Sequence, residues 1–431
     1  MKEQVSIPTS KIKRAANFAS AGAKVGGNYI KYYVKKALNS DTNKDELNAE
    51  NAEDIYQTLS KLKGSALKVA QMLSMDKNIM PQAYQNKFQM AQYSAPPLSF
   101  PLVLKTFKQH FDKSPHELFD TFEKTAKHAA SIGQVHEATL NGKKLAVKIQ
   151  YPGVSDSISS DLKLVKPIAT RLLNLKGKDI DKYFKEVELK LIEETDYKLE
   201  LKQSMAISDS CKNLKNVIFP QYYPELSSEK ILTMDWIEGI PFTEFANQKH
   251  SQEVYNQVGQ LLWDFYYHQI FNLMSVHADP HPGNFIITKD FKLGVIDFGC
   301  VKVIEPQFHK DYFALLNSNS INNDMEFTNT MYKLNYLLEE DEPKIVPVLK
   351  SSFKEMLLLL GKPFNSKTFN FGDDTYFRSI FELGERLSKM VELKKANGAR
   401  GPQDALYINR TCFGLYSLLN MIKADIRTGK G

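Results

Sequence analysis

Three residues in the second half of the chain have the types and spacing of a metal–phosphate site. Asp279 and Asn284 lie five residues apart in the segment Asp-Pro-His-Pro-Gly-Asn, and Asp297 begins an Asp-Phe-Gly triplet thirteen residues after Asn284. Mg²⁺ prefers oxygen ligands and is usually held by one or two side chains together with phosphate oxygens. Asn284 and Asp297 suit that role, which leaves Asp279 to orient or deprotonate an attacking hydroxyl group or water. Taken singly, Asp279 and Asn284 read as turn residues, but the three together predict a site for a nucleotide and its metal.

A lysine on a predicted strand supplies positive charge for the phosphates. Lys148 lies in the apolar run Leu-Ala-Val-Lys-Ile, where a lysine is costly to bury unless it meets an anion. In the kinase arrangement such a lysine contacts the α- and β-phosphates and pairs with a glutamate on a helix. Spacing alone leaves three candidates for that partner, Glu193, Glu194 and Glu200. The plainer alternative is an exposed lysine on an alternating strand.

The loop before the predicted hairpin that contains this strand, residues 128–135, reads His-Ala-Ala-Ser-Ile-Gly-Gln-Val. A glycine-rich loop would let the backbone approach phosphates closely. Only Gly133 lacks a Cβ atom here, so we expect a stiffer loop that holds the nucleotide differently. The candidate nucleotide contacts from this loop and the strands after it are Ala129, Ala130, Ser131, Gly133, Val135 and Ala146.

Two strand pairs must position these residues. Asn141-Gly142 separates the strand-like runs Gln134–Leu140 and Lys143–Gln150, and this dipeptide favours a two-residue hairpin because both turn positions need positive φ. A second pair is predicted at Asn284–Thr288 and Lys292–Ile296, with Asn284 and Asp297 at its ends. Short strands are also predicted near 216–219 and 230–236. Helices are predicted near 50–76, 100–112, 155–175, 180–210 and 251–275, and over the chain after about 305.

Composition limits the classes of function. The chain has 431 residues, 42% of them hydrophobic and 25% charged, which suits a globular protein of two or three domains. A net charge of +6 is mild and does not predict a nucleic-acid partner. Cys211, Cys300 and Cys412 lie far apart, which indicates neither a disulfide framework nor a zinc site and is typical of a reducing compartment.

The distribution of apolar and basic residues also predicts where the protein is located in the cell. No stretch of about 18 uncharged apolar residues suggests a membrane-spanning helix, and the N-terminus has no apolar signal-peptide core. We therefore expect a cytoplasmic protein. Residues 1–38 are locally basic, so peripheral contact with an anionic membrane surface is one expectation for them, and a solvated helix docked on the rest of the protein is the other.

Together these motifs resemble the UbiB-type atypical kinases, also called AarF-domain kinases, over most of residues 50–305. The resemblance rests on Ser-Ile-Gly-Gln-Val-His at 131–136, on Ala-Val-Lys-Ile-Gln-Tyr-Pro-Gly-Val at 146–154, and on the Asp-Pro-His-Pro-Gly-Asn and Asp-Phe-Gly segments. Ordinary protein kinases carry a glycine-rich loop and a His-Arg-Asp signature instead. The resemblance implies that Glu200 is the glutamate that pairs with Lys148.

The family also has a KxGQ motif on an N-terminal helix and an ExD motif. Lys68-Val69-Ala70-Gln71 occupies the first position, with Ala70 in place of glycine, and Glu194-Thr195-Asp196 matches the second. The resemblance implies that the helix with Lys68 and Gln71 lies across the cleft where a protein substrate would dock, in contact with Glu194 and Asp196. The usual third alanine of the alanine-rich loop is His128 here. These two departures bear on nucleotide preference, ATP or ADP.

The implied fold is α+β and bilobal, of the protein-kinase type, with a small β-rich N-lobe, a larger helical C-lobe and an N-terminal helical extension. We divide the chain into a basic segment and linker (1–48), the helical extension (49–115), the nucleotide-binding core (116–304) and the helical remainder of the C-lobe (305–431). Helix-forming residues resume by Pro306, which leaves no room for a long activation segment.

The implied activity is that of a Mg²⁺-dependent kinase or ATPase acting on a small molecule or lipid, linked to isoprenoid-quinone synthesis. A small-molecule phosphotransferase of the aminoglycoside-kinase sort is one alternative, disfavoured because that class needs no cleft-covering helix. A non-catalytic, nucleotide-binding pseudokinase scaffold is the other, disfavoured by the presence of Lys148, Asp279, Asn284 and Asp297 together.

Overall fold

The computed structural model describes residues 44–62, 98–129, 132–172, 179–390 and 400–429, with scattered residues between 16 and 35. The KxGQ-like segment with Lys68 and Gln71 lies outside the described residues, as do Ala130 and Ser131 of the alanine-rich loop.

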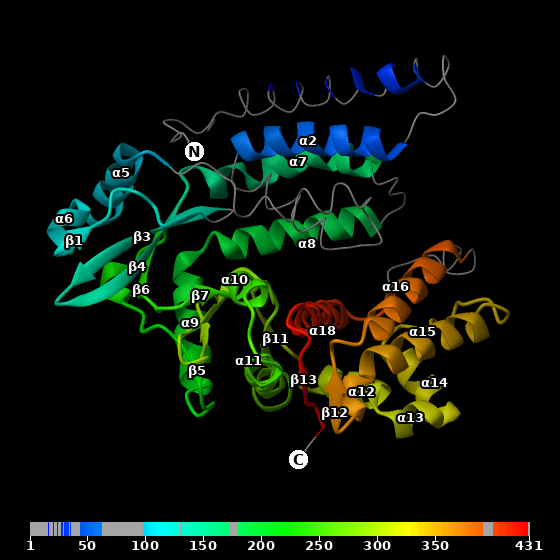
Figure 1. Ribbon diagram of the computed structural model, residues 1–431. Helices are drawn as coiled ribbons and strands as arrows, with labels where there is room; N and C mark the ends of the chain where they lie inside the picture. The colour runs from blue at the N-terminus through cyan, green and yellow to red at the C-terminus, as the bar shows by residue number, and fades with distance from the viewer. Residues whose placement is uncertain are drawn as a thin grey trace. The chain divides into compact units, whose positions relative to one another are not determined.

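The chain forms two compact units (Figure 1). The first unit comprises Met1–Lys202 and Gln221–Trp236, and the second comprises Gln203–Pro220 and Ile237–Gly431. Lys148 therefore belongs to the first unit, and the Asp-Pro-His-Pro-Gly-Asn and Asp-Phe-Gly segments belong to the second.

An antiparallel sheet organises the first unit (Figure 1). Its strands follow the order β1 (Thr121–Phe122), β3 (Gly133–Leu140), β4 (Lys143–Gln150) and β6 (Ile231–Asp235), with β2 (His128–Ala129) paired to β3. In the part of this unit that the structure describes, the α-helices are α2 (Lys44–Leu62), α5 (Phe100–Phe111), α6 (Pro115–Leu118), α7 (Val154–Leu172), α8 (Asp179–Glu194) and α9 (Tyr197–Ser210). The last turns of α9 belong to the second unit.

The predicted hairpin is confirmed as β3 and β4. Asn141 has φ 52° and Gly142 has φ 75°, as a turn with two left-handed positions requires. The register pairs Leu140 with Lys143 and Val135 with Lys148. Because side chains alternate along a strand, Lys148 shares one face of β4 with Ala146.

Both faces of β4 are buried. On one face, Val103 and Phe107 of α5 pack against Val147 and Ile149. On the other face, Ala146 belongs to a cluster with tyrosines from the β4–α7 turn and from α9. A strand covered on both sides reads as a continuous apolar run, which explains why Lys148 stands among apolar residues.

The single helix predicted over 180–210 is wrong, because the chain turns at Thr195 and Asp196 between α8 and α9. Asp196 caps the new helix, since its Oδ1 accepts a hydrogen bond from Leu199 N at 3.0 Å. The Gln150 side chain donates to Thr195 O at 2.9 Å and ties this turn to β4. The break gives α9 its own direction and brings its first turn to the strand of Lys148.

The second unit is mostly helical. After α9, its described α-helices are α10 (Phe242–Asn247), α11 (Gln252–His268), α12 (Pro306–Leu316), α13 (Ser318–Asn322), α14 (Asp324–Lys333), α15 (Val346–Gly361), α16 (Asp374–Lys389) and α18 (Gln403–Met421). Its strands form the order β5 (Val217–Ile218), β10 (Leu293–Val295), β9 (Phe285–Ile287), β7 (Ile240–Pro241), together with the pairs β8 (Ser275–His277) with β11 (Val301–Val303) and β12 (Thr368–Asn370) with β13 (Asp425–Arg427). None of the helices in the described part of the chain is long and apolar enough to span a bilayer.

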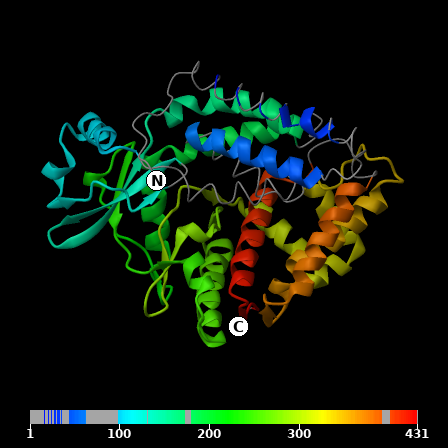
Figure 2. The same ribbon diagram turned by 45° about the horizontal axis from the view of Figure 1, so that its top comes forward.

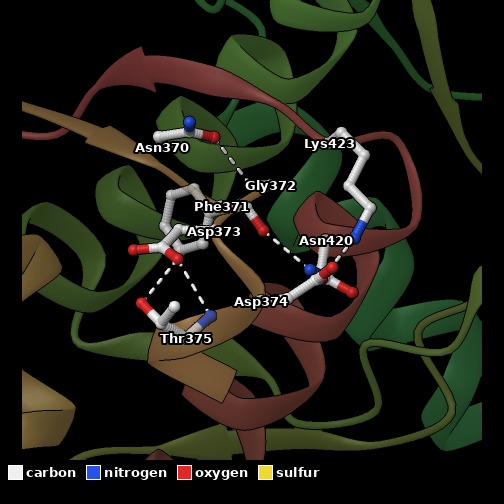
Figure 3. Close-up of polar contacts among 8 residues, drawn as sticks. All are labelled: Asn370, Phe371, Gly372, Asp373, Asp374, Thr375, Asn420 and Lys423. Carbon is white, nitrogen blue, oxygen red and sulfur yellow. Dashed lines mark hydrogen bonds and ion pairs between the residues drawn. The ribbon is translucent and has the colours of Figure 1, made fainter. Parts of the chain in front are cut away.

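Close packing fixes α18 inside this unit. It runs beside α11 in Figure 2, and a Cβ atom on Gly259 of α11 would lie 2.6 Å from Ala424 Cβ, just beyond the end of α18. The β12–β13 pair adds strands to a region predicted to be helical. Figure 3 shows the polar contacts next to it: Asn420 donates to Phe371 O at 2.8 Å, and Lys423 Nζ lies 2.7 Å from Asp374 Oδ1. These contacts tie the end of α18 and the residues just after it to the segment that leads into α16.

Candidate active site

Lys148 forms a buried ion pair. Its Nζ donates to Glu200 Oε1 at 2.7 Å, and the two side chains are 9% and 1% exposed. The ring of Tyr197 lies with its centre 5.0 Å from the same Nζ. Of the three glutamates that spacing left open, Glu200 is therefore the partner, while Glu193 pairs with Lys190 on its own helix.

Close packing explains why residue 133 is a glycine. A Cβ atom there would lie 2.7 Å from Ile149 O and 2.8 Å from the Tyr197 hydroxyl oxygen. Glycine thus allows β3 to approach both β4 and the start of α9. Its contact with a nucleotide stays a prediction.

Two residues of the Ser-Ile-Gly-Gln-Val-His segment form a buried hydrogen-bond chain that sequence reasoning missed. Gln134 Oε1 accepts from Leu98 N at 2.7 Å, and its Nε2 lies 2.7 Å from His136 Nε2. His136 Nδ1 lies 2.8 Å from Glu123 O. A carbonyl oxygen only accepts, so Nδ1 carries the proton and Nε2 accepts from the Gln134 amide. The available signal was the placement of two polar residues at alternate positions, and so on one face, of a predicted strand.

Burial lowers the pKa of His136, although the hydrogen bond to the Glu123 carbonyl opposes that shift. The neutral ring is the form that this chain of hydrogen bonds requires. Gln134 and His136 are both fully buried, and their hydrogen bonds hold the hairpin to residue 98.

The predicted metal ligands lie at one end of a strand pair. In the antiparallel register of β9 and β10, Val295 is opposite Phe285. The next hydrogen bond runs from Ile296 N to Asn284 O at 3.1 Å. Asn284 and Asp297 therefore leave the pair at the same end, as the sequence analysis expected.

Local hydrogen bonds orient these side chains. Asn284 Nδ2 donates to Asp279 O at 2.9 Å, which leaves Oδ1 as the amide atom suited to a cation. Asp297 Oδ1 accepts from Gly299 N at 2.8 Å. His281 Nδ1 accepts from Gly283 N at 3.0 Å and shapes the loop between Asp279 and Asn284. One amide oxygen and one carboxylate form a donor set that fits Mg²⁺ with phosphate oxygens.

The sequence profile of the ABC1 atypical kinase-like domain matches residues 90–331, more than half of the chain. The chain belongs to the ABC1 atypical kinase-like family. The mitochondrial atypical kinase COQ8 of Saccharomyces cerevisiae is 28% identical to it over 99% of this chain and 84% of that protein. The probable serine/threonine-protein kinase abkA of Dictyostelium discoideum is 25% identical over 98% of this chain and 78% of that protein.

A solved structure gives the same assignment for the fold. Rv3197 of Mycobacterium tuberculosis, in complex with erythromycin, matches with a TM-score of 0.62 and 26% identity, over 90% of this chain and 96% of that one. The resemblance to UbiB-type kinases and the kinase-like α+β fold are thereby confirmed. The roles assigned to individual residues stay predictions.

Buried residues of the second unit fix the position of the Asp-Pro-His-Pro-Gly-Asn loop, which carries Asp279. Phe298 of the Asp-Phe-Gly triplet is fully buried, with its ring centre 5.4 Å from that of His277. His277 N donates to Gln269 Oε1 at 2.8 Å, and burial lowers the pKa of the His277 imidazole. These contacts hold β8, and thus the start of the loop, at a fixed place in the second unit.

Arg410 is a third residue that sequence reasoning missed. This residue of α18 places Nη2 3.4 Å from Asp279 Oδ1, across 131 positions of sequence. It belongs to none of the motifs on which the resemblance rests, and a single arginine in a helical pattern gives no signal of such a contact.

Proposed function

We propose that this ABC1-family protein binds ATP with Mg²⁺ and transfers its γ-phosphoryl group to a small molecule or lipid, or to water, in support of isoprenoid-quinone or lipid metabolism. The observation that most supports this proposal is the buried ion pair of Lys148 and Glu200. Burying two charges costs desolvation energy that their attraction seldom exceeds. Stability alone therefore does not explain why this pair is buried. Binding of phosphate oxygens by the Lys148 ammonium group does explain it.

The chain's own residues divide the work. Lys148 binds phosphate oxygens, with Glu200 keeping its ammonium group charged and oriented. Asn284 and Asp297 offer oxygen atoms to Mg²⁺, which when bound neutralises phosphate charge. Asp279 orients or deprotonates the acceptor hydroxyl group or water. The alanine-rich loop, from Ala129 onward, covers the nucleotide.

The family resemblance supports a gate over this site. In the proposal, Lys68 and Gln71 contact Glu194 and Asp196 and restrict access for large substrates. Asp196 also caps α9 by accepting a hydrogen bond from Leu199 N, so the ExD segment would link the gate to the helix of Glu200. Lys68→Ala should change nucleotide affinity or ATP turnover, and a variant unchanged in both would remove the gate from the proposal.

The first test is a thermal-shift titration with ATP and with ADP, each with Mg²⁺ or EDTA. A ligand at about 100 times its Kd stabilises the folded state by about 2.7 kcal/mol. The Mg²⁺-dependent part of the shift should vanish in Asp297→Asn, and Lys148→Met should weaken nucleotide binding with or without Mg²⁺. Asp290→Asn is a matched control, since Asp290 lies in the turn at the other end of β9 and β10 and pairs with Lys292. Equal shifts in Asp297→Asn and Asp290→Asn would contradict the metal assignment.

The second test identifies the acceptor. ATP turnover is measured alone, with anionic liposomes, with quinone-precursor-like phenols and with erythromycin, for the wild type and Asp279→Asn. Erythromycin is included because the Mycobacterium tuberculosis structure contains it. Stimulation by phenols or liposomes supports the lipid-related function, and phosphorylation of erythromycin would favour the antibiotic-kinase class. Nucleotide binding without turnover under any condition would favour a pseudokinase.

We further propose that the protein works in the cytoplasm and makes peripheral contact with membranes through its basic N-terminal residues 1–38. The yeast relative is named as mitochondrial, so the location needs its own test. Co-sedimentation with anionic but not neutral vesicles, lost when residues 1–38 are removed, would support the contact. Equal sedimentation after that removal would contradict it.

A further inference from the structure

We propose that Arg410 of α18 is a positioning residue for Asp279, and that α18 braces the loop that carries this aspartate. The inference rests on the proposed phosphoryl-transfer function and deepens it. Arg410 Nη2 lies 3.4 Å from Asp279 Oδ1, and the two side chains are 26% and 17% exposed. An ion pair that is largely shielded from water is screened less than a surface pair. It therefore restricts how the Asp279 carboxylate turns.

A second contact joins the same helix to the next residue of the loop. Gly414 lies one helical turn after Arg410, on the same face of α18. A Cβ atom there would lie 2.2 Å from Pro280 Cγ. The helix backbone thus lies directly against the proline, and no larger residue fits without moving the loop.

Earlier turns of α18 hold the strands on which the loop depends. Asp404 Oδ1 lies 2.7 Å from Lys302 Nζ of β11. Tyr407 packs in a small buried cluster with Ala278 and Cys300, which are themselves joined by a hydrogen bond from Ala278 N to Cys300 O at 2.8 Å. One face of the helix therefore contacts the residues on both sides of Asp279.

The helix is fixed at its middle and at its end. Tyr312 of α12 donates to Asn409 Oδ1, next to Arg410. At the far end, Asn420 donates to Phe371 O just before α16, and Lys423 contacts Asp374 at the start of α16, as drawn in Figure 3. A helix held by its neighbours carries the Arg410 guanidinium at a defined place, so the position of Asp279 depends on packing in the last part of the chain.

The kinetic consequence follows from what Asp279 does in the proposed function. Misplacing a reacting group by about 1 Å can cost about 10²-fold in rate. Nucleotide binding relies on other residues, so it should persist. We expect Arg410→Met to lower kcat by about 10²-fold while KM for ATP stays within about twofold.

The experiment compares Arg410→Met, Arg410→Lys and Arg410→Ala with Arg386→Met. Arg386 is a matched control, because it also pairs with a carboxylate of the second unit, Glu355, but both side chains are more than half exposed. Arg410→Lys should recover most of the lost kcat. Guanidinium chloride at tens of millimolar should restore part of the kcat of Arg410→Ala, an effect that a merely structural role would not produce.

Hydrogen exchange gives a readout that needs no turnover. The amides of His281, Gly283 and Asn284 should exchange faster in Arg410→Met than in the wild type or Arg386→Met, because the loop loses one of its contacts. Arg410→Lys, the variant most certain to fold, should fall between them.

The outcomes separate the two proposals. If the wild type shows no Mg²⁺-dependent nucleotide-induced rise in melting temperature, the proposed function is wrong. Hydrogen exchange of the loop amides is then the only test of whether α18 supports the loop. Unchanged loop exchange in Arg410→Met overturns the inference in either case. With an active wild type, it is also overturned by unchanged kcat, or by a parallel loss of nucleotide binding and kcat with no rescue by guanidinium.

Discussion

Glu200→Gln should destabilise the first unit more than any exposed charge substitution. The variant takes away the carboxylate 2.7 Å from the Lys148 ammonium group, in a site where the two side chains are 9% and 1% exposed. Removing one partner of a buried pair typically costs about 3–5 kcal/mol. At about 2–4 °C per kcal/mol for a unit of roughly 200 residues, the melting temperature should fall by about 6–20 °C.

A double variant separates stability from function. Lys148→Met with Glu200→Met replaces both charges by apolar side chains of similar length, and such replacements are often neutral or stabilising. The double variant should regain most of the stability that Glu200→Gln loses. It should nevertheless show no nucleotide-induced shift, because the double variant lacks the buried lysine that we propose as the phosphate ligand.

Urea unfolding followed by intrinsic fluorescence measures these free energies, and melting with and without MgATP measures binding. Glu229→Gln is the matched control. Its partner Lys198 is also on α9, but that pair is about two-thirds exposed on both sides, where ion pairs contribute little. If Glu200→Gln is as stable as Glu229→Gln, the Lys148–Glu200 ion pair does not carry the energetic cost expected of a buried pair, and the prediction is wrong. If the double variant still binds MgATP as the wild type does, Lys148 is not the phosphate ligand.

Two further predictions concern the hairpin. Gly133→Ala should lower the stability of the first unit by about 1–3 kcal/mol, because the new methyl group would lie 2.7 Å from Ile149 O and 2.8 Å from the Tyr197 hydroxyl oxygen; unchanged urea unfolding would contradict this. Burial lowers the pKa of His136 below 6.5, so the unfolded chain binds a proton that the folded chain does not, and stability should fall as pH drops below about 6.5. His136→Phe, which keeps the ring stacked on Phe122, should flatten that decline between about pH 7.5 and 5.5, and an equal slope in both proteins would refute the assignment.

Local sequence signals predicted the local parts of the site. Asn141-Gly142 predicted the hairpin because both turn positions need positive φ. The Asp-Phe-Gly triplet predicted the end of a strand pair, and Asn284 and Asp297 do leave β9 and β10 at the same end. In each case the residues that determine the geometry are close neighbours in the chain.

Distant contacts could not be predicted in the same way. The residues from 180 to 210 favour a continuous helix, and the break at Thr195 depends on a hydrogen bond from Gln150, 45 positions earlier. The contact of Arg410 with Asp279 spans 131 positions. The choice of Glu200 over Glu193 follows from that break, because α9 starts anew and directs its first turn to β4. Spacing along one helix contains no information about such a change of direction.

The two sets of proposed site residues are held in place by different forces, and this difference makes their functions separable. Lys148 depends on a charge partner in a buried site, so its variants change stability and binding together. Asp297 is oriented by the Gly299 amide, which donates to Oδ1. Asparagine keeps an oxygen at that position and can accept the same hydrogen bond. Asp297→Asn therefore changes the charge offered to a metal while preserving the local fold, so a loss of the Mg²⁺-dependent shift without a loss of basal stability would point to metal binding itself.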